Sequence, residues 1–175
     1  MLVDNNRNKS DLILEEVKKR GRCADIVDVE EEKTILVIFK LHGDYYAFYG
    51  NGIKEILPFE EIAYVPGCPD FIFGIINVRG DIESVLNIHK IMNLAESQTT
   101  KDTRIIIAAK DDIRSGILVD SVEDVLDVPV SYIINKPVST LDKSIREFAV
   151  GGERLYGNNY VTILDLGKIF GKILT

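Results

Sequence analysis

The sequence has few cysteines and no long apolar run. Its 175 residues include only two cysteines, Cys23 and Cys68, which favours free thiols in a reducing compartment over a disulfide framework. No stretch approaches the roughly 20 consecutive apolar residues of a membrane-spanning helix. The polar N-terminus lacks the apolar segment of a secretory signal. These absences predict a cytoplasmic protein that does not insert into a membrane.

Positive charge is also scarce. The 21 lysines and arginines are outnumbered by 28 aspartates and glutamates, so the net charge is −7. The densest basic run, residues 18–22, is flanked by acidic residues. Because nucleic-acid binding needs a clustered basic face, we expect no nucleic-acid partner.

Sequence motifs of catalysis and metal binding are missing as well. There is no P-loop, dinucleotide-binding, G-x-S-x-G or H-E-x-x-H pattern. The two histidines, His42 and His89, lack the spacing of metal ligands, and we expect both at the surface. Period-two alternation divides a short acidic cluster between two strand faces (Asp120, Glu123, Asp124 and Asp127). We therefore predict a binding module with no catalytic residue, cofactor or metal.

What the sequence does contain, from Thr34 onward, is a series of short β-strand patterns separated by turn residues. Two hairpins are predicted, one joining 34–41 to 45–49 and one joining 71–80 to 81–86. Further strands are expected at 52–58, 103–109, 114–120, 122–128, 146–150 and 160–165. Many short strands of this kind predict a mostly β fold built from small barrels.

Two segments show helical periodicity instead. Apolar residues recur with helical spacing in both (Ile88, Ile91, Met92 and Ala95; Leu166, Ile169, Phe170, Ile173 and Leu174). Asn87 and Asp165 precede these segments as candidate N-caps. Residues 1–33 differ from the rest, and we interpret them as an appended arm with a possible short helix from Ser10 to Gly21. Residues 34–175 then form two β-lobes joined near 95–102.

Two pairs of segments resemble each other within the chain. Residues 85–92 align with 163–170, and residues 52–58 align with 121–129. Each pair is about 70–80 residues apart and keeps the same order along the chain. This similarity predicts a duplicated unit and hence two similar lobes.

Arg79 is unusual because it lies within an otherwise apolar segment. If residues 73–79 form a strand, Ile76 and Val78 face one way, while Asn77 and Arg79 face the other. Gly80 then permits a turn. Taken alone, these residues favour an exposed arginine at a strand end with no special role.

Four segments resemble the CheW family, the coupling proteins of bacterial chemotaxis. Residues 71–80 are similar to its signature, with the matching positions at Gly74, Asn77, Val78, Arg79 and Gly80. Residues 52–56 resemble the family strand that carries an apolar residue and a glutamate, here Ile53 and Glu55. Residues 115–128 resemble a segment of the second lobe, in which Val119, Asp120, Val122, Asp124, Val125 and Leu126 match. Residues 160–170 resemble the last strand and helix of the family. The chain departs from the family at Glu83, Ser84 and Asn87, where apolar residues, a proline and an aspartate cap are common.

The resemblance implies a fold, a function and a site. The fold would be two intertwined, five-stranded β-barrels with a shared core and short helices, including one at the C-terminus. The function would be a non-enzymatic adaptor in the cytoplasm that joins the tip of a chemoreceptor (a methyl-accepting chemotaxis protein) to the regulatory domain of the histidine kinase CheA in membrane-associated arrays. An ion pair between Glu55 and Arg79 would lie at a receptor-binding groove, and the second lobe would meet the kinase. The resemblance assigns nine residues to the groove: Ile53, Glu55, Gly74, Asn77, Val78, Arg79, Gly80, Val122 and Val125.

Other functions remain compatible with the sequence. One is a scaffold of the same family in another histidine-kinase pathway, such as control of motility or development. Another is a β-barrel that binds a small ligand. A third, an acid-dependent hydrolase, would need two carboxylates facing one cleft.

Overall fold

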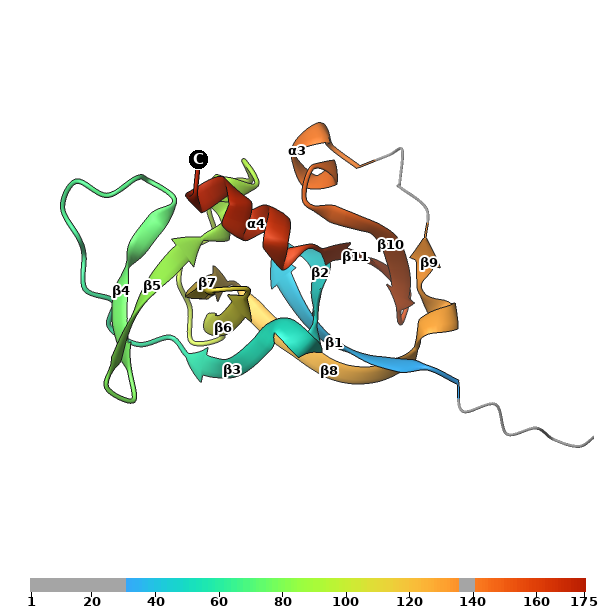
Figure 1. Ribbon diagram of the computed structural model, residues 1–175. Coiled ribbons are helices and arrows are strands. Elements are labelled where there is room, and N and C mark those ends of the chain that lie inside the picture. Colours follow the sequence, from blue (N-terminus) through green and yellow to red (C-terminus); the bar gives the residue numbers. More distant parts are fainter. Residues whose placement is uncertain (1–30, 136–140) are drawn as a thin grey trace, which may run out of the picture. The chain divides into compact units, whose positions relative to one another are not determined.

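The computed structural model describes residues 31–135 and 141–175 (Figure 1). The helix predicted from Ser10 to Gly21 and nearly all of the predicted arm therefore lie outside the described residues. Residues 32–175 form one compact unit. Its first strand begins at Lys33. In these described ranges no helix is long and apolar enough to cross a membrane.

The described chain is mostly β-strand, as predicted. In chain order its elements are β1 (Lys33–Leu41), β2 (Asp44–Tyr49), the 3-10 turn η1 (Gly50–Gly52), β3 (Ile53–Pro58), β4 (Ile72–Val78), β5 (Asp81–Asn87), α2 (Ile88–Ile91), β6 (Arg104–Lys110), β7 (Ile113–Val119), β8 (Ser121–Pro129), the 3-10 turn η2 (Val130–Tyr132), β9 (Ile134–Asn135), α3 (Lys143–Arg146), β10 (Ala149–Tyr156), β11 (Asn159–Leu164) and α4 (Leu166–Ile173).

The strands form two sheets with a repeated order. One sheet is β8-β1-β2-β11-β10-β9, and the other is β3-β6-β7-β5-β4. In each sheet the fourth strand pairs in parallel with the third, β11 with β2 and β5 with β7. The predicted internal repeat follows this order, since residues 52–58 and 121–129 are the edge strands β3 and β8. Residues 85–92 and 163–170 are the strand–helix units β5–α2 and β11–α4.

The sheets are interleaved along the chain, and their connections differ from the prediction in two ways. The second sheet is inserted between β2 and β8, so the chain crosses between sheets at η1 and at Asp120. Residues 95–102 instead join α2 to β6 within one sheet and do not link the lobes. Among the described residues, no strand pairing joins β3 to β4 or β8 to β9. Each sheet is therefore open rather than a closed barrel.

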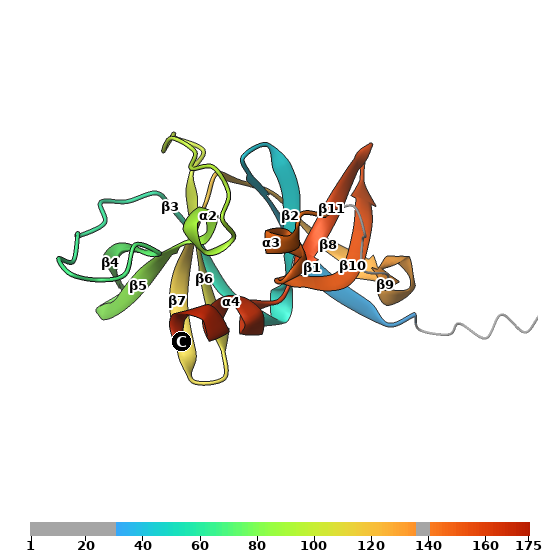
Figure 2. The ribbon, with the colours of Figure 1, turned by 90° about the horizontal axis from the view of Figure 1, so that it is seen from above.

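The apolar core consists of three clusters, and the largest lies between the two sheets. It takes Val37 and Phe39 from β1 and Ile106 from β6. The residues that alternate with these along β1 and β6 point to the opposite face. There Leu36 of β1 belongs to a second cluster, and Ile105 of β6 belongs to a third. Because β1 and β6 bury both faces, their sequences are continuous apolar runs. Figure 2 shows α4 between the two groups of strands, and its residues Ile169 and Phe170 belong to the central cluster.

The two predicted helices exist, but one is shorter than the periodicity suggested. Asn87 caps α2 by accepting from the backbone N–H of Lys90, and Asp165 caps α4 by accepting from Gly167. After α2, Asn93 has a φ of 54° and the N–H of Leu94 donates to the carbonyl of His89, which is a helix-terminating Schellman arrangement. Ala95 therefore lies beyond the helix and is exposed.

Two other predictions near the C-terminus were wrong. Leu174 continues the apolar spacing of α4, but it follows the last helical residue and is 75% exposed. The strand expected at 146–150 is divided, because Arg146 ends the short helix α3 and β10 begins only at Ala149.

Candidate functional site

The hairpin between β4 and β5 turns at Arg79 and Gly80. Val78 pairs with Asp81, so the loop contains only these two residues. Both have positive φ, 54° for Arg79 and 99° for Gly80, as a type I′ turn requires. The side-chain oxygen of Asn77 accepts a hydrogen bond of 2.8 Å from the N–H of Gly80. Asparagine and glycine suit these positions, whereas an arginine at positive φ is uncommon, so the turn holds Arg79 at some cost in stability.

Arg79 forms the predicted ion pair with Glu55. The Nη2 atom lies 2.6 Å from Oε1, and the two side chains are 80% and 25% exposed. Glu55 belongs to β3 and Arg79 follows β4, which are the two outer strands of one sheet. The pair thus connects the two edges of an open sheet. Because Arg79 is so exposed, we expect the pair to contribute only about 0–1 kcal/mol to stability.

Gly74 has a structural role beneath the surface. Ala63 and Ile75 exchange two backbone hydrogen bonds of 2.9 Å, which bring residues 62–63 against β4. A Cβ at Gly74 would lie 2.5 Å from the carbonyl oxygen of Ala63 and from a methyl group of Ile62. Gly74 is buried, so it permits this approach and presents no side chain to a partner.

The other predicted groove residues differ in their surroundings. Val78 is only 4% exposed and packs in the apolar cluster of its own sheet, so it does not line a surface. Ile53 and Val122 are partly buried, and both pack against the central cluster between the sheets. Val125, on β8, is 53% exposed.

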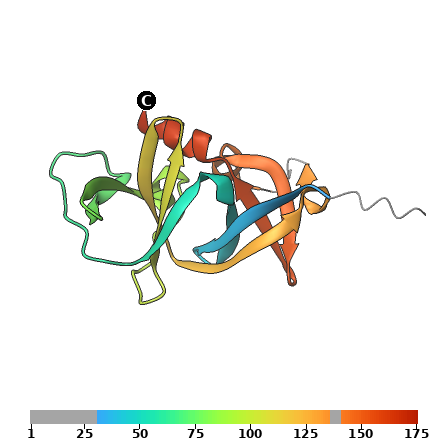
Figure 3. The ribbon, with the colours of Figure 1, turned by 60° about the horizontal axis from the view of Figure 1, so that its bottom comes forward.

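Three of these residues, Ile53, Val122 and Val125, lie on edge strands with an unpaired side. In the part of the chain that is described, β3 pairs only with β6, and β8 pairs only with β1. Figures 1 and 3 both place β3 and β8 along the same side of the molecule. A receptor-binding groove formed by β3 and β8 remains a prediction. Glu55, which pairs with Arg79, lies on β3.

The departures at Glu83 and Ser84 are accommodated by partners that the sequence did not indicate. Glu83 is 7% exposed, and its Oε1 accepts from Nε of Arg114 at 2.9 Å. Ser84 and Ser115 share a hydroxyl hydrogen bond of 2.7 Å between β5 and β7. A buried acid paired in this way is compatible with the fold. Neither partner could be recognised without knowing that β5 and β7 are neighbours.

The expectation that His89 lies at the surface is wrong. Its residue exposure is 4%, and its Nε2 lies 3.2 Å from Oδ1 of Asp120. The prediction that the acidic cluster of residues 120–127 is solvated is only partly correct. Asp120 is half-buried, while Asp127 is exposed. His42 is exposed in the β1–β2 turn, as predicted. No group of three or more potential metal-ligating side chains is found within 31–135 and 141–175.

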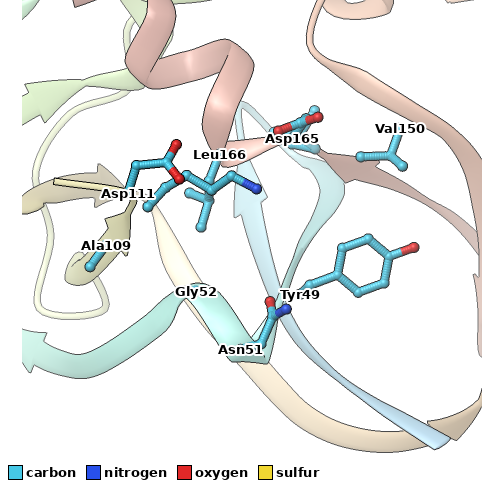
Figure 4. Close-up of a pocket in the computed structure, with 10 residues that line it drawn as sticks. Tyr49, Asn51, Gly52, Ala109, Asp111, Val150, Asp165 and Leu166 are labelled. Atoms are coloured by element: carbon cyan, nitrogen blue, oxygen red, sulfur yellow. The ribbon is translucent and has the colours of Figure 1, made fainter. Parts of the chain in front are cut away.

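A separate pocket, not anticipated from the sequence, lies beside the start of α4 (Figure 4). Its volume is about 430 Å³, and Tyr49, Asn51, Lys110, Asp111 and Leu166 are among its lining residues. Asp165 also lines it, but its carboxylate already caps α4. The other charged lining residues are Lys110, which ends β6, and Asp111, which follows it, and both are exposed. This arrangement does not by itself define a ligand.

Comparison with known proteins gives consistent matches. The family model described as the CheW-like domain matches residues 36–173. "Chemotaxis protein CheW" of Bacillus subtilis (strain 168) is 33% identical over 140 residues, covering 78% of this chain and 86% of that protein. The protein of the same name from Treponema pallidum (strain Nichols) is 27% identical and covers 81% of this chain and 85% of its own length.

A solved structure agrees with the sequence matches. The crystal structure of the scaffolding protein TtCheW from Thermoanaerobacter tengcongensis aligns with a TM-score of 0.69 and 28% identity, covering 79% of this chain and 93% of that one. The match includes both sheets, since the family model extends from β1 into α4. The chain therefore belongs to the CheW family.

Proposed function

We propose that this protein is a non-enzymatic adaptor that couples chemoreceptors to the histidine kinase CheA in bacterial chemotaxis. Its partners would be the cytoplasmic tip of a receptor and the regulatory domain of the kinase, met in arrays at the inner face of the membrane. Family membership supports the role. The observation that carries the proposed receptor site is the exposed Glu55–Arg79 pair, at 2.6 Å, held by a turn that an arginine adopts at a cost.

The edge strands β3 and β8 offer suitable chemistry for a helical partner. Val125 exposes an apolar side chain, while Ile53 and Val122 are partly exposed beside the central cluster. An amphipathic helix binds by setting an apolar ridge against such residues. Arg79 then adds an oriented, mostly exposed cation. A small contact of this kind gives modest affinity, which suits an array in which many contacts act together.

Receptor binding tests the role of the ion pair. Arg79→Ala and Glu55→Ala should each weaken binding of a receptor cytoplasmic fragment about tenfold, since one charge-assisted contact is worth about 1–2 kcal/mol. Isothermal titration calorimetry measures the affinity, and circular dichroism verifies the fold. Lys172→Ala is a matched control because it breaks another exposed ion pair, 3.1 Å from Glu147, away from β3. Wild-type affinity in both test variants would remove the pair from the receptor site.

A second candidate is the scaffold of a different histidine-kinase pathway. One relative, "Protein FrzA" of Myxococcus xanthus, is 23% identical and covers 66% of this chain and 74% of its own length, so relatives of this chain do not all carry the name CheW. Co-purification of the full chain with a chemotaxis kinase and with a receptor fragment discriminates between the two. Capture of a kinase without any receptor fragment would favour the second candidate.

A further inference from the structure

The internal repeat extends to single residues of the edge strands β3 and β8. In β3, the pairing with β6 skips one residue between Ile53 and Glu55. In β8, the pairing with β1 skips one residue between Val122 and Asp124. Both strands therefore carry a β-bulge at the same place, and Asp124 is the structural counterpart of Glu55.

The two acids make matching contacts across their open sheets. Glu55 reaches Arg79, which follows β4. Asp124 reaches Tyr156, the last residue of β10, whose hydroxyl donates to Oδ2 at 3.1 Å. Counted from β3 and from β8, the strands β4 and β10 are both fifth in their sheets, and each leads into a two-residue turn. Each sheet thus has a polar contact between its first strand and the end of its fifth.

Tyr156 is a well-anchored donor for the Asp124 carboxylate. Its ring packs against the apolar cluster of its own sheet and lies 5.8 Å from the ring of Tyr45. The hydrogen bond to Asp124, together with desolvation, raises the pKa of the Tyr156 hydroxyl above its ordinary value, so the hydroxyl stays protonated at neutral pH. The other oxygen of Asp124, Oδ1, accepts from the backbone N–H of Val125 at 2.8 Å. The carboxylate therefore links β10 directly to the backbone of β8.

This link acts on a strand that forms part of the proposed receptor site. Val122 and Val125, two of the predicted groove residues, lie on either side of Asp124 along β8. Within the described residues β8 pairs only with β1, so its other side has no neighbouring strand. An edge strand that is held in place before a partner arrives avoids the cost of being ordered during binding. Tyr156 is placed to supply this hold.

We propose that Tyr156 is a positioning residue of the receptor site, which fixes Asp124 and thereby holds β8 as one side of the groove. The inference rests on the proposed receptor binding and adds to it a residue outside the two edge strands. The Tyr156 hydroxyl acts within the sheet and makes no contact with the receptor. Without the hydroxyl β8 is more mobile, and part of the binding free energy is spent on ordering the strand.

Hydrogen–deuterium exchange of the full chain tests the hold on β8 without any partner. Tyr156→Phe removes the hydroxyl and keeps the ring, so amides of residues 121–129 should exchange about three- to tenfold faster, the scale of one hydrogen bond. Amides of β3 should keep their wild-type rates. Tyr160→Phe is the matched control, because Tyr160 is 67% exposed on β11 of the same hairpin. Wild-type exchange of β8 in Tyr156→Phe, or an equal effect of Tyr160→Phe, would overturn the proposal.

Calorimetric titration with a receptor cytoplasmic fragment tests the consequence for binding. Tyr156→Phe and Asp124→Ala should each weaken the affinity about three- to tenfold, while Tyr160→Phe retains it. The double variant should be no weaker than either single one, because the tyrosine acts through the acid. Asp124→Asn should bind like wild type, since asparagine can accept from the Val125 N–H and donate to the tyrosine oxygen.

The outcomes separate this inference from the proposed function. Wild-type affinity in Tyr156→Phe, or additive losses in the double variant, would overturn the inference. So would an Asp124→Asn variant as weak as Asp124→Ala, because the carboxylate charge would then act on the receptor directly. A wild-type chain that binds no receptor fragment, but shows the expected exchange pattern, would contradict the receptor role and support the hold of Tyr156 on β8.

Discussion

At the scale of single residues, Arg79 combines an unfavourable backbone with an exposed charge. The two-residue turn needs positive φ at both positions, and Gly80 meets this need without strain. Arg79 adopts this conformation at a steric cost that most residues with a Cβ incur, and that is smaller for asparagine. Because the position favours glycine or asparagine, we propose that the Arg79 side chain has a role beyond the turn.

This cost predicts opposite effects on stability and binding. Arg79→Asn places a residue that favours type I′ turns at the first loop position, so the free energy of unfolding should rise by about 0.5–1 kcal/mol. The same change removes the charge and should weaken binding of the receptor fragment. Urea denaturation and calorimetric binding measure the two effects. A variant that is less stable than wild type would show that the Glu55 pair outweighs the backbone cost.

At the scale of elements, the packing of residues 62–63 on β4 depends on the missing side chain of Gly74. Gly74→Ala places a Cβ 2.5 Å from the backbone oxygen of Ala63, and we expect a loss of about 1–3 kcal/mol in stability, the usual cost of overpacking. Gly171→Ala is the control. It lies in α4 with open space around it, and alanine there should add about 0.5–1 kcal/mol. Denaturant midpoints of both variants test this, and equal effects in the two would contradict it.

Local signals predicted much of the element structure. The caps at Asn87 and Asp165, the pairing of β4 with β5 and the end of β3 at Pro58 follow from residue type and spacing. Arg79 was expected at a strand end, but it lies in the turn. The end of α2 was missed because Asn93 adopts positive φ within an otherwise helical apolar pattern. The burial of His89 and the pairing of Glu83 with Arg114 were missed for a different reason. Both depend on neighbours that only the sheet topology brings together.

At the scale of the whole described unit, the two sheets share one core. Phe39 of β1 is fully buried in the central cluster, where its ring lies 4.7 Å from that of Phe48. The cluster also includes Ile106 and Ile117 from the other sheet. Neither sheet keeps its apolar surface covered if the other unfolds. The internal repeat therefore does not imply two independent folding units.

This shared core predicts a single unfolding transition. Calorimetry of the full chain should give a van't Hoff enthalpy equal to the calorimetric enthalpy. Phe39→Ala should lower the free energy of unfolding by about 3–5 kcal/mol and still leave one transition. Two resolved transitions, with only one of them shifted by the substitution, would show that the sheets unfold separately.

The most direct test of the adaptor role is co-sedimentation of CheA with membranes that carry a chemoreceptor, with and without this protein. If the protein couples the two, the amount of kinase in the pellet should rise with its concentration and reach saturation, and Arg79→Ala should shift the curve to higher concentration. An amount of pelleted kinase that is the same with and without the protein would contradict the account.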